Sequence, residues 1–190
     1  MRENDTSRSD EDLYAGFLKG ERTAYDDLMR RHGDSLLWYL YGIMHDYQDA
    51  EDMMIESFAR IMVKKPWISE GCFKAYLFKT ARNLTIRHLK KTSKYELFDL
   101  DGMEDVLTAD ESSESSYIKN EKLAILNKCL SRIESEYREA LYLVYLDGMS
   151  YSQAADVMKT SIKKLDHLLQ KGKIRMREEL KKEGVEDPYM

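Results

Sequence analysis

Basic side chains gather in two stretches of the sequence. Residues 72–94 contain no acid and seven bases, namely Lys74, Lys79, Arg82, Arg87, Lys90, Lys91 and Lys94. Residues 159–182 contain nine bases and only three acids. Taken alone, each stretch is also typical of a solvated helix face. Two such stretches in one chain favour a function in which both bind the same polyanion, although the chain as a whole has a formal net charge of −5.

The first basic stretch interleaves its cations with aromatic rings. Tyr76 and Phe78 lie among the bases, and the preceding segment, with Pro66 and Gly71, predicts a loop that displays Trp67. Aromatic rings stack on unpaired bases while cations hold the nucleic-acid backbone. The same mixture also occurs in ordinary buried helices, so it does not decide the function alone.

The second basic stretch follows the pattern of a helix-turn-helix. Ser150 and Gln153 have the spacing of a capping box, which predicts a short helix over residues 151–158, and a turn at 159–161 leads into a long helix. On the long helix the 3.6-residue period predicts an inward face, made of Ile162, Leu165, Leu169, Gly172, Met176 and Leu180. The opposite face centres on His167 and carries Lys163, Lys164, Gln170 and Lys171. Such donors read base edges and phosphates; a solvated basic helix is the alternative.

A third helix, expected to start near Asp49, has one acidic face. Its core face carries Ala50, Met53, Met54, Phe58 and Ile61, and its opposite face carries Asp52, Ile55, Glu56, Ala59 and Val63. An apolar row within acids is unusual for a solvated surface. It favours a docking surface for a partner over the core of a larger bundle.

The residues that could catalyse a reaction or bind a metal are scattered. The four histidines (His32, His45, His88, His167) lack metal-ligand spacing, Cys72 and Cys129 stand alone, and no Gly-rich phosphate loop is present. We therefore expect no enzyme, no metal and no cofactor. The acidic start of the chain and the lack of a long apolar run predict a cytoplasmic protein with no membrane insertion.

The composition favours an all-α fold. Only 2 Pro and 9 Gly occur in 190 residues, which suits long helices. Further helices are expected at 9–20, at 24–44 with a break at Gly33, at 73–91, at 117–130 and at 133–146. Between the basic stretches, residues 95–118 contain eight acids and no base, which is typical of a flexible linker.

Three motifs in this order resemble an extracytoplasmic-function (ECF) sigma factor of the sigma-70 class, over roughly residues 10–182. The first is Asp49-Ala50-Glu51-Asp52 with Glu56-Ser57-Phe58, similar to AEDL-x-QE-x-F. The second, residues 76–84, reads YLFKTARNL and is similar to WLYRIARN. The third, residues 146–155, reads LDGMSYSQAA and is similar to L-x-G-x-S-Y-x-E-I-A.

The resemblance implies two small helical domains. These are a sigma-2 bundle over residues 9–92 and a sigma-4 helix-turn-helix domain over 117–182, joined by a flexible acidic linker over 93–116. It implies binding to core RNA polymerase, to −10 and −35 elements of double-stranded promoter DNA and to the single −10 strand, and control by an anti-sigma factor. A stand-alone helix-turn-helix regulator is the alternative, but it gives the motifs at 49–84 no role.

The resemblance also implies residue roles. Polymerase docking falls to Asp49, Asp52 and Glu56, together with Ile55 and Ala59. Recognition and melting of the −10 element fall to Trp67, Tyr76, Arg82 and Asn83, with Arg87, Lys90 and Lys91 on the same helix. Recognition of the −35 element falls to Lys163, Lys164, His167, Gln170 and Lys171. The sequence departs from the family pattern at Ile55 (usually Gln), at Tyr76 (usually Trp), and at Asp166 and Leu168, where polar or basic residues are usual.

Overall fold

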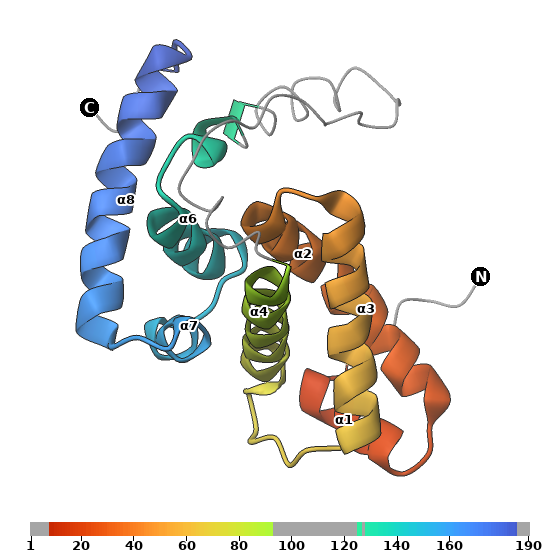
Figure 1. Ribbon diagram of the computed structural model, residues 1–190. Coiled ribbons are helices and arrows are strands. Elements are labelled where there is room, and N and C mark those ends of the chain that lie inside the picture. Colours follow the sequence, from red (N-terminus) through yellow and green to blue (C-terminus); the bar gives the residue numbers. More distant parts are fainter. Residues whose placement is uncertain (1–7, 93–124, 127, 186–190) are drawn as a thin grey trace, which may run out of the picture.

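The computed structural model describes residues 8–92, 125–126 and 128–185, and these form helices and connecting turns without any strand. The predicted linker at 93–116, and residues 117–124 of the helix expected after it, lie outside the described residues. The elements, shown in Figure 1, are α1 (Asp10–Leu18), α2 (Arg22–Met44), α3 (Tyr47–Lys64), α4 (Phe73–Lys91), α6 (Ser135–Leu141), the π-helix η2 (Tyr142–Leu146), α7 (Tyr151–Met158) and α8 (Ile162–Lys182). The all-α prediction is confirmed.

Helices α1 to α4 form an N-terminal bundle whose helix starts follow from local sequence. Ser9 and Asp12 form a capping box at the start of α1. The Asp46 side chain accepts a hydrogen bond from the Asp49 backbone N–H (3.0 Å), so α3 begins two residues earlier than expected. α2 passes through Gly33 unbroken.

The C-terminal helices contain the predicted helix-turn-helix, α7 followed by α8. Ser150 and Gln153 form a capping box, and Ser161 caps α8 by accepting from the Lys164 backbone N–H at 3.1 Å. Gly172 allows α8 to lie close to α6, because a Cβ atom there would lie 3.2 Å from Leu141 and Tyr137 side-chain atoms. The single helix expected at 133–146 is instead α6 followed by η2. The wider turn is closed by the Asp147 backbone N–H, which donates to the Tyr142 carbonyl at 2.9 Å.

Two positions on α8 differ from the sequence expectation. Ile162, predicted to face inward, is 53% exposed, whereas Leu168 is buried. Ile162 is the first residue of α8, where the chain leaves the turn after α7, so its side chain lies beyond the packed part of the helix. Leu168 joins Leu165 and Leu169 in the core because α8 buries a wider stripe than a single row of positions three and four apart.

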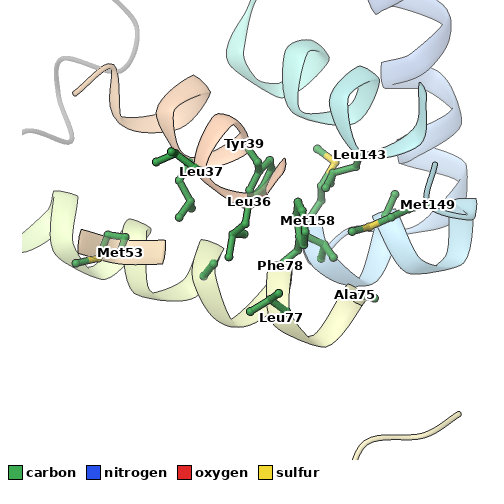
Figure 2. Close-up of a cluster of buried hydrophobic side chains, with 14 of the residues drawn as sticks. Leu36, Leu37, Tyr39, Met53, Ala75, Leu77, Phe78, Leu143, Met149 and Met158 are labelled. Carbon is green, nitrogen blue, oxygen red and sulfur yellow. The ribbon is translucent and has the colours of Figure 1, made fainter. Parts of the chain in front are cut away.

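The N-terminal bundle and the C-terminal helices pack against each other. α4 contacts α2 and α3 on the bundle side and α7 on the other side, and α2 also contacts α6. Figure 2 shows Leu77 and Phe78 of α4 in one apolar cluster with Leu143 of η2, Met158 of α7 and Met149 from the turn between them. This explains why the apolar residues of α4 do not segregate to one face: the helix is buried on two sides.

Candidate functional site

The outward face of α3 is an apolar row between acids. Asp52, Ile55 and Glu56 are exposed and Ala59 is half-buried, while Ala50, Phe58 and Ile61 on the opposite face are buried. Ile55 is 50% exposed and Val63 is 78% exposed. Because Ile55 and Val63 are exposed, this face is not part of the core that the described residues form, which goes against the alternative of a larger bundle.

Asp49 lies apart from that row. It is half-buried, and its carboxylate lies 4.0 Å from Nε2 of His88 on α4. Of the predicted docking residues, Asp49 therefore takes part in a contact between α3 and α4. We call Asp52, Ile55, Glu56 and Ala59 the α3 row.

The loop between α3 and α4 presents Trp67 to solvent. Lys65 ends α3 in the left-handed conformation (φ 43°), which turns the chain sharply into Pro66. The Tyr14 hydroxyl of α1 then donates to the Pro66 carbonyl at 2.8 Å and fixes the start of the loop. The next residue, Trp67, is 85% exposed. An indole held out by an anchored loop can stack on a planar partner without rearranging the core.

The predicted −10 residues on α4 occupy different surroundings. Tyr76 is half-buried and packs on the core, Asn83 is half-buried, and Arg87, Lys90 and Lys91 are exposed at the C-terminal end of the helix. With a rise of about 1.5 Å per residue, Tyr76 and Lys91 lie roughly 22 Å apart along the axis. Together with Trp67 in the preceding loop, this set follows the whole length of α4.

Arg82, a member of the predicted −10 set, is half-buried and contacts α6. Its Nε donates to Oε1 of Glu139 on α6 at 2.6 Å and its Nη2 donates to Oε2 at 3.2 Å. The Tyr39 hydroxyl of α2 donates to the same Oε1 at 2.6 Å. Burial, and then the charge of Glu139, raise the pKa of Tyr39 well above its ordinary value, so this hydroxyl keeps its proton.

Two further lysines of α4, which had no role assigned from the sequence, also contact acidic residues in the C-terminal part of the chain. Lys79 Nζ is 2.6 Å from Oδ1 of Asp156 on α7. Lys74 Nζ is 3.0 Å from Oδ1 of Asp147 and donates to the Asp147 carbonyl at 2.6 Å. Their signal in the sequence was the same acid-free stretch that contains Arg82. We call Lys74, Lys79 and Arg82 the α4 cation row.

The predicted −35 residues form one exposed face on the N-terminal half of α8, where Lys163, Lys164, His167, Gln170 and Lys171 are all exposed. Two of them have partners: Gln170 Nε2 donates to Oδ2 of Asp166 at 2.9 Å, and Lys164 Nζ lies 3.5 Å from Oε1 of Glu136. Asp166 therefore lies within this face and orients Gln170. Leu168 points into the core and takes no part in the face.

Within the described residues, no three His, Cys, Asp or Glu side chains gather as a metal site would require. None of the described helices has the length and apolar character needed to span a membrane.

Two family models match the chain, one in each set of helices. Residues 28–95 match Sigma-70 region 2, and residues 123–176 match Sigma-70, region 4. The region 2 match contains the α3 row, Trp67 and α4, and the region 4 match contains the helix-turn-helix.

Two ECF RNA polymerase sigma factors align with most of the chain. The chain is 25% identical over 162 residues to the ECF RNA polymerase sigma factor SigM of Bacillus subtilis, covering 85% of this chain and 98% of SigM. It is 23% identical over 164 residues to the ECF RNA polymerase sigma factor SigE of Mycolicibacterium smegmatis, covering 86% of this chain and 64% of SigE. The chain thus spans just under two thirds of the length of SigE.

Solved structures share the fold. The structure of CnrH in complex with the cytosolic domain of CnrY gives a TM-score of 0.63 at 20% identity, covering 90% of this chain and 97% of that chain. The sigma factor RpoE in complex with the anti-sigma factor NepR from Bartonella quintana gives 0.62 at 18% identity, covering 83% and 96%. With a region 2 match, a region 4 match and ECF relatives over most of its length, the chain belongs to the sigma-70 family, as an ECF RNA polymerase sigma factor.

Proposed function

We propose that this sigma factor directs promoter-specific initiation by binding core RNA polymerase through the α3 row. The observation that carries the proposal is that Ile55, inside the region 2 match, stands half exposed between the exposed acids Asp52 and Glu56. An apolar centre with an acidic rim suits a basic helical partner whose own apolar residues would be buried on docking. Asp49 lies outside the α3 row, and its contact with His88 of α4 helps to hold α3 in place.

Promoter contacts are assigned to three surfaces. Trp67 and Tyr76 stack on unpaired bases near the −10 element, with Asn83 nearby to hydrogen-bond a base edge. The α4 cation row, with Arg87, Lys90 and Lys91, holds the phosphates on either side. The exposed face of α8 reads the −35 element in the major groove, as helix-turn-helix recognition helices do.

The remaining assignments follow from this role. The protein acts as an initiation factor and not as an enzyme, and it works in the cytoplasm with the polymerase and DNA. An anti-sigma partner is supported by the solved relative RpoE, which is described as a complex with an anti-sigma factor. A stand-alone helix-turn-helix regulator is less well supported, because that function would not account for residues 28–95, which match Sigma-70 region 2.

The test is transcription in vitro from a library of randomised promoters, with purified core polymerase and the full chain. We expect transcripts whose templates share two elements, one near −10 and one near −35, and no transcripts with either component alone. Enrichment of a single element bound without polymerase would instead support the stand-alone regulator.

A further inference from the structure

The C-terminal helices carry an apolar groove that opens to solvent beside the second half of α8. Its volume is about 270 Å³, and its apolar lining includes Leu126, Leu130, Tyr145, Leu146 and Met176. Tyr145 and Leu146 are 48% and 49% exposed, so a large apolar area there remains in contact with water. Two cations, Lys173 and Arg177, line the same groove. The groove therefore suits an occupant that combines apolar side chains with acids.

The end of α8 turns the chain next to this groove. Gly184 is left-handed (φ 74°), and the Val185 backbone N–H donates to the Leu180 carbonyl at 3.0 Å. This is the long hydrogen bond of a Schellman motif, which ends a helix and reverses the chain over the last turn. Leu180 follows Met176 by four residues and Lys173 by seven, so all three lie on one side of α8. The chain at Val185 is therefore attached to the side of α8 that lines the groove.

Five residues of the sequence, Glu186-Asp187-Pro188-Tyr189-Met190, follow Val185 and lie beyond the described residues. We propose that residues 186–190, the tail, run back along α8 and occupy the groove. The two acids of the tail meet the cations, and Tyr189 and Met190 cover the exposed apolar side chains. The tail and the groove are both outside the surfaces to which the proposed function assigns polymerase and promoter DNA, so the contact does not depend on that function.

The tail has the length that this path requires. An extended chain spans at most about 3.3–3.6 Å per residue, so five residues reach roughly 17 Å. At about 1.5 Å per residue, Met176 lies roughly 6 Å and Lys173 roughly 10 Å from Leu180 along the helix axis. Pro188 disfavours the helical conformation at the residue before it and so favours an extended path. The acids, which come first, can reach Arg177, and the last two residues can reach Met176 and Tyr145.

Charge and tethering both favour the tail over another occupant. The tail has two acids and no base, whereas the described residues that line the groove include two cations and no acid. Lys173 Nζ already lies 4.7 Å from the centre of the Tyr145 ring, which places positive charge beside an aromatic wall. A short tether gives an effective concentration in the mM range, so even a weak contact is occupied. A second copy of the chain would have to bind without that advantage.

Methyl NMR of the full chain tests the contact directly. The methyl groups of Met and Leu are labelled with ¹³C, and the Met190 signal is assigned by its loss in Met190→Leu. We expect NOEs from the Met190 methyl to those of Met176 and Leu130, and a chemical shift that differs from that in a free peptide of residues 186–190. A Met190 methyl with the shift of the peptide and no NOEs to the groove would overturn the proposal. NOEs between differently labelled chains would assign the tail to a second copy and overturn it as well.

A charge placed in the groove should release the tail. Leu146→Asp changes a half-exposed residue of the groove, so the Met190 NOEs should be lost and its shift should return to the value of the peptide. Leu18→Asp, at a leucine of α1 that is 43% exposed, is the matched control and should keep the NOEs. NOEs that persist in Leu146→Asp, or that are lost equally in both variants, would contradict the assignment of the tail to this groove.

A charge exchange tests the same contact without altering the apolar lining. Asp187→Arg should weaken the Met190 NOEs several-fold, because the new cation is repelled by Arg177, and Arg177→Asp in the same chain should restore them. The control replaces Arg177→Asp by Lys171→Asp, which makes the same charge change about 120° away around α8 and should not restore the NOEs. Unchanged NOEs in Asp187→Arg, or equal restoration by the two second changes, would refute the pairing of the tail with the groove.

Discussion

His32 Nε2 lies 2.7 Å from Oδ2 of Asp10, which joins the first turn of α1 to the middle of α2. Arg31 holds the other carboxylate oxygen at 2.7 Å, and the His32 ring lies 6.0 Å from the ring of Phe73, the first residue of α4. One carboxylate therefore ties α1 to α2 next to the start of α4. Burial acts to raise the pKa of Asp10, but the hydrogen bonds and charges of His32 and Arg31 outweigh it and lower the pKa below the ordinary 3.8.

This pair predicts an acid-sensitive contribution to stability. Because the pKa of Asp10 is lower in the folded than in the unfolded chain, its contribution is complete above about pH 4 and is lost as the pH falls through the folded value. Asp10→Asn should lower the free energy of unfolding by about 1–3 kcal/mol at pH 7. The difference between wild type and variant, from urea unfolding at a series of pH values, should shrink below pH 4. A difference that is constant down to pH 2.5 would contradict the role given to the carboxylate.

Polymerase docking is tested by charge reversal on the α3 row. Asp52→Arg with Glu56→Arg should weaken binding to core polymerase by about 2 kcal/mol or more, roughly thirtyfold, while leaving the melting temperature nearly unchanged, since both side chains are exposed. Asp26→Arg with Asp34→Arg makes the same charge change at exposed sites on α2 and is the control. Polymerase affinity is measured by biolayer interferometry. If both double variants lost polymerase affinity equally, the cause would be a general charge effect, and the assignment of docking to the α3 row would be wrong.

Promoter opening is tested at Trp67. Because its indole is 85% exposed, Trp67→Ala should change stability by no more than about 0.5 kcal/mol. Loss of a stacked base costs about 1–3 kcal/mol, so permanganate reactivity of thymines near −10 should fall while closed-complex binding persists. A template with a pre-melted −10 bubble should largely rescue the variant. Trp38→Ala, at an exposed indole on α2, is the control. Wild-type permanganate reactivity in Trp67→Ala would refute the melting role.

Helix boundaries and outward faces could be predicted from the sequence because their causes are local. The capping boxes at Ser9 and Ser150 each lie within a few residues, the charge pattern of α4 lies in one continuous stretch, and the helical period predicted which side of α3 is outward. The same period failed at Ile162 because a helical projection treats the first turn as if it were packed like the middle of the helix.

The pairing between the two sets of helices could not be predicted. Lys79 and Asp156 are 77 positions apart in the sequence, so no local pattern can specify that they meet. The sequence contains a basic stretch and a predicted acidic linker, but the acids that face α4 are Glu139, Asp147 and Asp156, which lie singly in helices and turns beyond residue 118. That these acids contact α4 follows only from the packing of the C-terminal helices against α4.

Readout of the −35 element depends on the exposed face of α8. Lys171 and Lys163 are expected to hold phosphates, so Lys171→Ala should lower affinity for every promoter sequence and reduce the salt slope by roughly one unit. His167→Ala should instead relax the preference at one −35 position, because a contact to a base edge discriminates by about 1–3 kcal/mol, with little change in the salt slope.

Asp166 gives this readout a further test. Its carboxylate accepts a hydrogen bond from Gln170 at 2.9 Å and so fixes the direction of that amide. Asp166→Ala should therefore raise overall DNA affinity by removing an acid near phosphates, and at the same time broaden the preference at the base pair that Gln170 contacts. The measurement is binding of a −35 substitution library to wild type, His167→Ala, Asp166→Ala and Gln170→Ala. Asp166→Ala and Gln170→Ala should broaden the same position, because one residue acts through the other. If neither shifts any position while Lys171→Ala still weakens all sequences, α8 serves as an electrostatic support and the bases are read elsewhere on the domain.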